Sequence, residues 1–283
     1  MPQISLVVCV HNEGNLLARL LEAAHGCYDD LVVVHDGPEQ IDSQRSTEQL
    51  VAEHEGEFFT QPRSFQQETH WPFAWSQARY DWVLRLDADE VPSIELKQWL
   101  CSFRAALEPE QSISGYTCIW PLWNGHEIVT QRWPTGRIFL FQKQRVRFFG
   151  MNEQVPIPDG RFESLRLILE HRPARKSYGF RNLLLRKQAY LWRRVIAQSL
   201  LGKPTDLQCW RWTSEDWPTI WEDIRRRPLR TACYRLVMWP LFNLRQMKRA
   251  EGWVILSAVA FTGVHHCFVA LRYWYLRLSR PKT

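Results

Sequence analysis

Apolar runs alternate with amphipathic and polar stretches through the first part of the chain. Residues 4–10 and 31–35 are almost unbroken runs of Val, Leu and Ile, which is typical of strands covered on both faces. Between them, residues 16–24 place leucine at helical spacing, and Gly26 follows as a stop signal. The pattern therefore predicts a strand, a helix and a second strand that runs parallel to the first.

The same alternation continues to about residue 90. Ser46 and Gln49 have the spacing of a capping box and predict the start of a second helix. Residues 57–60 predict a weak third strand, 73–79 a helix and 81–86 a further buried strand. We therefore expect an α/β fold with a mostly parallel sheet flanked by helices.

Polar side chains follow three of these strands at the points where the strands end. Val10 closes the first strand and precedes the polar segment 11–15, and Asp36 follows the second. Asp87 and Asp89 follow the strand at 81–86. Carboxyl ends of parallel strands share one edge of a sheet, so we expect these groups to line one crevice. The aspartate pair can hold a divalent cation, although a bare pair of this kind also occurs in solvated acidic turns.

A nucleotide is the natural occupant of such a crevice, but the usual glycine-rich phosphate cradles are missing. None of the thirteen glycines forms a Gly-x-Gly pair, and no Gly-Lys-Ser/Thr sequence is present. This excludes the dinucleotide fingerprint and the P-loop. A cation on Asp87 and Asp89 would instead neutralise the phosphates and act as a Lewis acid.

Three motifs occur in order, HNEGN after the first strand, HDGP after the second and LRLDADE at the strand before residue 90. Together they resemble glycosyltransferase family 2 over roughly residues 3–190. The resemblance implies a GT-A fold, a nucleotide-diphosphate-sugar donor such as a UDP-sugar, and Mg²⁺ or Mn²⁺. It also implies a role for each matching residue: Val10, His11 and Glu13 line the nucleotide pocket, Asp36 contacts the base, Asp87 serves the ribose, and Asp87 and Asp89 hold the metal.

Two features depart from the family pattern. His35 stands where members often carry the first Asp of Val-Asp-Asp-Gly-Ser, and the usual Arg-Asn pair is replaced around residues 71–72. The basic contact to the diphosphate is therefore open. Arg63 or Arg79 could supply it, and each also fits an ordinary solvated arginine.

The middle of the chain resembles family members that build the lipopolysaccharide core. Residues 137–141 resemble their Arg-Leu-Phe-Arg strand, and the resemblance implies that Glu153 is the catalytic base, with Glu90 and Asp159 as alternatives. An inverting transfer needs such a base, which typically contributes ~10²–10⁴-fold. GT-A enzymes sometimes supply a late histidine to the metal, which makes His171 a candidate ligand; a simple hydrogen-bonded histidine is the alternative.

A change in composition predicts two domains, a transferase domain over residues 1–200 and an Arg- and Trp-rich helical region over 201–283. From Ile224 onward there are twelve Lys/Arg but a single acid, Glu251. Residues 252–271 carry no charge, but their Gly, Ser, Thr and His make a spanning helix a poor fit. We expect helices that lie on an anionic membrane surface; a helical layer packed on the transferase domain is the alternative.

These features predict an inverting, metal-dependent glycosyltransferase. The acceptor is expected to be lipid-linked, or a lipopolysaccharide or polysaccharide, at the cytoplasmic face of the membrane. Seven scattered cysteines without a Cys-x-x-Cys pair predict reduced thiols in a cytoplasmic, peripheral protein, and no nucleic-acid-binding module accompanies the basic stretch. The alternatives are a metal-dependent nucleotidyltransferase and a non-catalytic membrane-associated binding protein of the same fold.

Overall fold

The structure is a computed structural model, and the chain falls into two compact units. The structure describes residues 1–39, 45–64, 67–106, 110–121, 136–150, 155–172, 187–201, 209–211, 219–238, 241 and 252–279. Unit 1 comprises 1–123, 130–173 and 208–212, and unit 2 comprises 124–129, 174–207 and 213–283.

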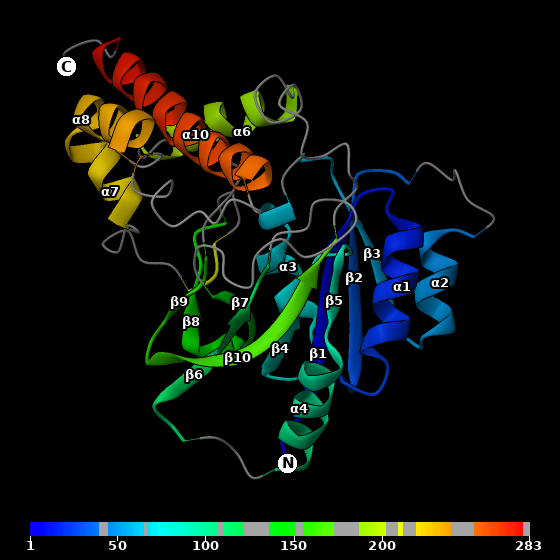
Figure 1. Ribbon diagram of the computed structural model, residues 1–283. Helices are drawn as coiled ribbons and strands as arrows, with labels where there is room; N and C mark the ends of the chain where they lie inside the picture. The colour runs from blue at the N-terminus through cyan, green and yellow to red at the C-terminus, as the bar shows by residue number, and fades with distance from the viewer. Residues whose placement is uncertain are drawn as a thin grey trace. The chain divides into compact units, whose positions relative to one another are not determined.

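Unit 1 is built around an eight-stranded sheet with the order β3-β2-β1-β4-β7-β6-β10-β5 (Figure 1). Its strands are β1 (Ile4–Val10), β2 (Asp30–Asp36), β3 (Glu57–Gln61), β4 (Trp82–Arg85), β5 (Glu90–Pro92), β6 (Ile113–Ile119), β7 (Arg137–Gln142) and β10 (Arg161–His171). The neighbours β3, β2, β1 and β4 run parallel, as the βαβ pattern predicts. The sheet as a whole is mixed, because β7 runs antiparallel to β4 and β6, and β5 antiparallel to β10. Strands β8 (Val146–Arg147) and β9 (Ile157–Pro158) form a separate pair.

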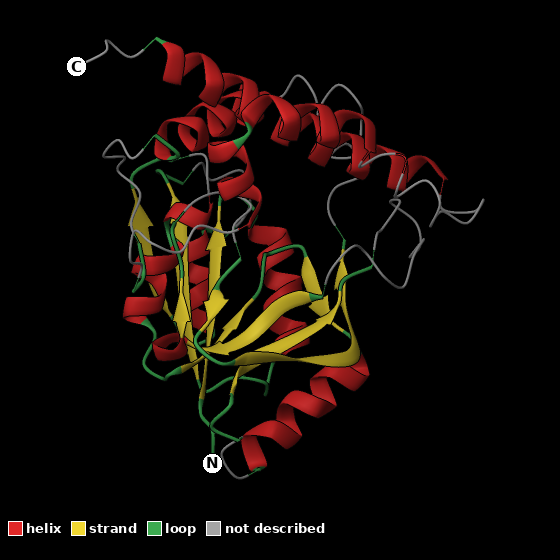
Figure 2. Cartoon of the chain, turned by 90° about the vertical axis from the view of Figure 1, so that its left-hand side faces the viewer, coloured by secondary structure: helices red, strands yellow, loops and turns green. Residues whose placement is uncertain are grey.

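Helices cover both faces of this sheet, and Figure 2 shows them packed along the strands. One face carries α1 (Gly14–Ala24), α2 (Thr47–Glu53) and α4 (Ile94–Ala105), and the other carries α3 (Trp71–Gln77). Short 3₁₀ turns, η1 (Gln67–Thr69) and η2 (Lys143–Arg145), lie beside them. Strand β1 serves both layers, because its alternate side chains point to opposite faces: Leu6 and Val8 enter one core, Val7 and Cys9 the other.

Local sequence signals mark the ends of these helices. The predicted capping box of α2 is confirmed: Ser46 Oγ accepts from the Gln49 backbone N–H at 3.1 Å, and Gln49 Oε1 accepts from the Ser46 N–H at 3.1 Å. Gly26, just beyond α1, has a φ of +82°, which glycine adopts without strain. Helix α3 begins at Trp71, before the predicted 73, because a proline in the first turn loses no hydrogen bond. All seven cysteines are free thiols in the structure.

Unit 2 is helical in the part that the structure describes. It contains α6 (Lys187–Ser199), α7 (Thr219–Arg226), α8 (Pro228–Cys233), the π-helical turn η4 (Tyr234–Met238) and α10 (Gly252–Leu278). Helix α10 packs against α6, α8 and η4. Among the described residues, no helix combines the length and the apolar character that crossing a bilayer requires.

Candidate functional site

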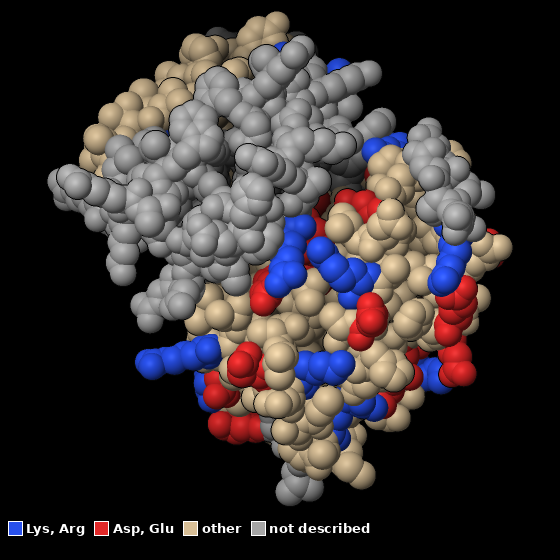
Figure 3. All heavy atoms as spheres, turned by 45° about the vertical axis from the view of Figure 1, so that its right-hand side comes forward, with Lys and Arg blue, Asp and Glu red and all other residues tan. Residues whose placement is uncertain are grey.

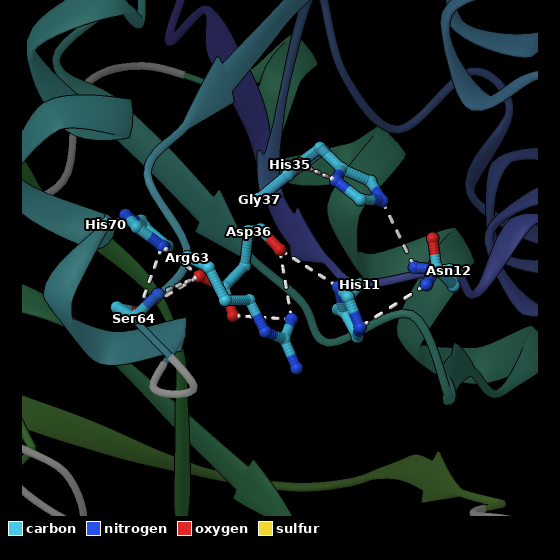
Figure 4. Close-up of polar contacts among 8 residues, drawn as sticks. All are labelled: His11, Asn12, His35, Asp36, Gly37, Arg63, Ser64 and His70. Carbon is cyan, nitrogen blue, oxygen red and sulfur yellow. Dashed lines mark hydrogen bonds and ion pairs between the residues drawn. The ribbon is translucent and has the colours of Figure 1, made fainter. Parts of the chain in front are cut away.

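Asp36, the last residue of β2, is the centre of a buried polar network. Its side chain is 4% exposed, and Oδ1 accepts hydrogen bonds from the Ser64 backbone N–H at 2.6 Å and from His70 Nε2 at 2.8 Å. Oδ2 forms an ion pair with Arg63 Nη1 at 2.8 Å (Figure 4). Burial by itself would raise the pKa of Asp36, but His70, Ser64 and Arg63 lower it to about 2. The carboxylate is therefore held as an anion in one orientation.

This lowered pKa predicts a pH-dependent contribution to stability. The folded-state pKa of about 2 lies below the ordinary value of 3.8, so the contribution is present above pH ~4 and is lost as pH falls towards ~2. It amounts to about 2 kcal/mol. We expect the unfolding free energies of the natural protein and of Asp36→Asn, measured in urea at about pH 6 and about pH 3, to converge at the lower pH. A difference that does not change with pH would contradict this assignment.

Two histidines tie the segments that follow β1 and β2 to each other. His35 Nδ1 donates to the Gly37 carbonyl at 2.6 Å, and His35 Nε2 accepts from the Asn12 backbone N–H at 3.1 Å. Only a neutral ring with its proton on Nδ1 makes both bonds. His11 Nδ1 donates to the Asp36 carbonyl at 2.9 Å, and burial lowers the pKa of His11. Figure 4 shows both rings beside Asp36.

A second network follows β4. Asp87 Oδ2 lies 2.6 Å from Arg137 Nη2, and Arg137 Nε lies 2.9 Å from Glu90 Oε1. The Asp87 backbone N–H donates to Glu90 Oε2 at 2.8 Å. Arg137, the first residue of β7, thus bridges two carboxylates, one of which, Glu90, is fully buried. Burial raises the pKa of Glu90 even though Arg137 acts in the opposite direction.

Asp89 pairs with His171 at the end of β10. His171 Nε2 lies 3.3 Å from Asp89 Oδ2, and the Arg172 backbone N–H donates to the Asp89 carbonyl at 2.8 Å. Burial would raise the pKa of Asp89, but His171 lowers it below its ordinary value. Trp120 stacks on the His171 ring with centroids 4.2 Å apart, and the Arg137 guanidinium lies 5.6 Å from the Trp120 ring. The Trp120 indole therefore contacts both Arg137, which binds Asp87 and Glu90, and His171, which pairs with Asp89.

Both networks lie at one edge of the sheet. Strand β1 lies between β2 and β4, so the segments that follow these three parallel strands are neighbours. Cys9, which is buried in β1, is influenced by the charges of both networks. Burial raises the pKa of the Cys9 thiol well above its ordinary value, and the charges of Asp87 and Asp36 act in the same direction. The predicted meeting of the polar groups after the strands is therefore present in unit 1.

The remaining predicted site residues occupy different positions. Val10 is fully buried at the end of β1, and Glu13 is the residue before α1, where its carbonyl accepts from the first-turn N–H groups. Glu153 lies outside the described residues. Of its alternatives, Glu90 is held by Arg137, and Asp159 forms ion pairs with two arginines, Arg147 and Arg211.

Arg63 and Arg79, the two candidates for the basic contact to the diphosphate, have different surroundings. Arg63 is committed to Asp36, where it binds both the carboxylate and the backbone carbonyl, whereas Arg79 is exposed. Sequence reasoning missed His70, Trp120 and Arg137 as members of the site. For Arg137 a signal was present, because a charged residue at the start of an apolar strand needs a partner.

The donor set suits a divalent cation only in part. In the described chain, no group of three or more His, Cys, Asp or Glu side chains is arranged to hold a metal. Asp89 Oδ2 and His171 Nε2 nevertheless face each other, and Mg²⁺ or Mn²⁺ commonly takes one or two protein ligands and completes its shell with phosphate oxygens and water. These two side chains fit such a cation, whereas Asp87 reaches Arg137.

A comparison with protein-family models identifies the family of this chain. The model of the family described as Glycosyl transferase family 2 matches residues 5–165. A comparison with curated proteins found no match. The solved structures that the chain matches include glucosyl-3-phosphoglycerate synthase from Mycobacterium tuberculosis in complex with Mn²⁺, UDP and glucosyl-3-phosphoglycerate, at 15% identity and TM-score 0.44, over 72% of this chain and 81% of that one. They also include S. aureus TarS 1-349 in complex with UDP, at 12% identity and TM-score 0.45, over 99% of this chain and 93% of that one.

The family model covers more than half of the 283 residues and includes Asp36, Asp87 and Asp89, whereas His171 lies beyond the matched range. The resemblance to family 2 that the three motifs indicate is thereby confirmed. This chain belongs to glycosyl transferase family 2, and it is a glycosyltransferase.

Proposed function

We propose that the enzyme transfers a sugar from a nucleotide-diphosphate-sugar, a UDP-sugar, with inversion at the anomeric carbon and with a divalent cation. The acceptor is lipid-linked, or a lipopolysaccharide or polysaccharide, at the cytoplasmic face of the membrane. The observation that supports the donor most is the convergence, at one sheet edge, of the anionic Asp36 network and the Asp89–His171 pair. One network suits the base and the other suits the diphosphate.

On the donor side, the ionised Asp36 accepts a hydrogen bond from an N–H group of the base, in a pocket lined by Val10, His11 and Glu13. His11 and His35 preserve this geometry, because their Nδ1 bonds to the backbone carbonyls of Asp36 and Gly37 hold the segments after β1 and β2 together. Asp87, oriented by Arg137, takes the ribose. Preorganised groups of this kind lower the cost of ordering the donor on binding.

At the reacting end, Asp89 and His171 would hold the cation, Mg²⁺ or Mn²⁺, which would supply charge neutralisation for the departing diphosphate. Glu153 accepts the proton of the acceptor hydroxyl as its oxygen attacks the anomeric carbon. Glu90 is poorly suited to that task, because its carboxylate is fully buried and bound by Arg137. Asp159 is held by arginines on both oxygens.

The domain organisation follows the same proposal. Residues 1–200 act as the transferase domain, and residues 201–283 act as a helical, membrane-associated extension that keeps the enzyme near its acceptor. The described helices of the C-terminal region and its excess of arginine support this assignment.

A screen of nucleotide-sugars tests the donor. We expect one UDP-sugar to raise the melting temperature of the full chain in the presence of Mn²⁺, because a ligand bound only to the native state stabilises it. The same donor should release UDP on turnover, and Glu95→Gln, which changes an exposed carboxylate on α4, should behave like the natural protein. Release of pyrophosphate from a nucleoside triphosphate would instead indicate a nucleotidyltransferase, and the absence of any nucleotide-sugar effect would contradict the proposal.

A further inference from the structure

Unit 2 contains a basic pocket whose lining shares no residue with the site described above. Its volume is about 290 Å³, and its lining residues come from α7, α8 and η4: Asp223, Arg227, Arg230, Thr231, Tyr234 and Arg235. This volume is close to the lower end of the range of sites that hold small molecules, ~300–1,000 Å³. The pocket is therefore large enough for a compact polar headgroup.

The lining contains three arginines and a single acidic residue, Asp223. Arg227 and Arg230 are exposed, and neither side chain forms an ion pair with any residue that the structure describes. The Asp223 backbone carbonyl accepts bonds from the Arg227 N–H at 2.8 Å and from Thr231 Oγ1 at 3.1 Å, which holds α7 against α8. Guanidinium groups bind phosphate oxygens in a bidentate manner, so the chemistry of the pocket favours a phosphate.

Exposed apolar residues are the sequence neighbours of these arginines. Leu229 precedes Arg230, and residues 236–238 (Leu, Val and Met) directly follow Arg235; all four apolar side chains are 45–55% exposed. Tyr234, which lines the pocket, is 49% exposed. A site for a free phosphate does not require exposed apolar side chains beside it, whereas a phospholipid presents a phosphate next to apolar chains. The combination therefore fits a lipid headgroup.

Helix α10, which packs on α8 and η4, carries a second exposed apolar surface. Phe268, Leu271, Tyr275 and Leu278 recur at spacings of three and four residues, so they lie on one face of the helix, and all four are exposed. Aromatic and leucine side chains on one face of a helix, with arginines nearby, are typical of interfacial helices.

Charge argues for an anionic membrane as the partner. On the face of the molecule shown in Figure 3, basic side chains of unit 1 lie among acidic ones, whereas the chain from Ile224 onward carries twelve Lys/Arg and one acid. A second copy of this chain would bring two cationic surfaces together, which is unfavourable. A nucleic acid would leave the apolar side chains without a partner.

We propose that the pocket of Arg227, Arg230 and Arg235 binds the phosphate of an anionic phospholipid, with the neighbouring apolar side chains of α8, η4 and α10 against the bilayer. The inference rests on the proposed function in one respect: that function gives the reason why this transferase meets a membrane. Binding itself is independent of catalysis, so it can fail or succeed while the donor assignment stands.

Co-sedimentation of the full chain with vesicles tests the proposal. We expect binding to phosphatidylcholine vesicles that contain phosphatidylglycerol, weaker binding in high salt, and little binding to phosphatidylcholine alone. The double variant Arg227→Gln with Arg230→Gln should weaken vesicle binding about 30-fold, since each of the two arginines contributes a similar amount to the free energy of binding to an anionic leaflet. Val237→Ser with Met238→Ser should weaken it as well, even at low salt.

Arg226→Gln is the matched control, because Arg226 lies outside the pocket lining and pairs with Glu222. A loss of binding free energy per arginine in this control as large as that in the double variant would overturn the pocket and indicate general charge attraction. Soluble glycerol phosphate that stabilises the protein, without any vesicle binding, would also overturn the proposal, since it would indicate a site for a free phosphate. Melting curves of each variant confirm that the fold is retained, and UDP release in detergent solution should remain unchanged.

Discussion

Replacing Asp89 with alanine is expected to lower kcat/KM for the nucleotide-sugar donor by roughly 100- to 1,000-fold, the size of effect seen when one preorganised charge-stabilising group is removed. The carboxylate lies 3.3 Å from His171 Nε2, and the proposed function assigns to these two side chains the cation beside the diphosphate. Without Asp89, His171 would be the one side chain of this pair left to hold the cation. The loss should fall mainly on kcat, because the developing charge on the leaving diphosphate is no longer neutralised.

Binding of Mn²⁺ gives a readout that does not depend on turnover. Titration of the protein with Mn²⁺ in the presence of UDP, followed by electron paramagnetic resonance, should show a weaker site in Asp89→Ala and an intermediate one in His171→Ala. Glu95→Gln should bind Mn²⁺ like the natural protein, because Glu95 is fully exposed on α4. Turnover by Asp89→Ala equal to that of the natural protein would exclude the metal role of this residue.

Replacing Arg137 with methionine is expected to destabilise the fold by about 3 kcal/mol, the lower end of the cost of removing one partner of a buried ion pair. Arg137 bridges Asp87 and Glu90, and the Glu90 side chain is 0% exposed. Methionine fills similar space but leaves a buried carboxylate without its cation. Urea unfolding at pH 7 measures the difference.

The pH dependence of this loss separates charge from packing. Burial already raises the pKa of Glu90 with Arg137 present, so in the variant Glu90 takes up a proton more readily as pH falls. The deficit relative to the natural protein should therefore be larger at about pH 7 than at about pH 5. Arg147→Met is the control, because the Arg147–Asp159 pair is 24% and 34% exposed and should contribute less than about 1 kcal/mol. A deficit of equal size at both pH values would assign the effect to packing.

The sequence by itself determined the parallel half of the sheet and the polar groups that follow its strands. These features are local: an apolar run predicts a strand, leucines at helical spacing predict the crossover helix, and the handed βαβ unit brings strand ends to one edge. Asp36, Asp87 and Asp89 could be placed for that reason. The capping box of α2 is likewise readable from four residues.

The tertiary structure alone decided which charges meet. Arg137 reaches Asp87 from fifty residues away, and His70 reaches Asp36 from thirty-four, because β7 pairs with β4 and η1 and α3 follow β3. No pattern of spacing specifies such pairs, since a charged residue on a strand or turn looks the same in sequence whether it is solvated or buried against a partner. The same holds for unit 2: composition reveals an excess of arginine, but only the packing of α7, α8 and η4 decides which arginines share a pocket.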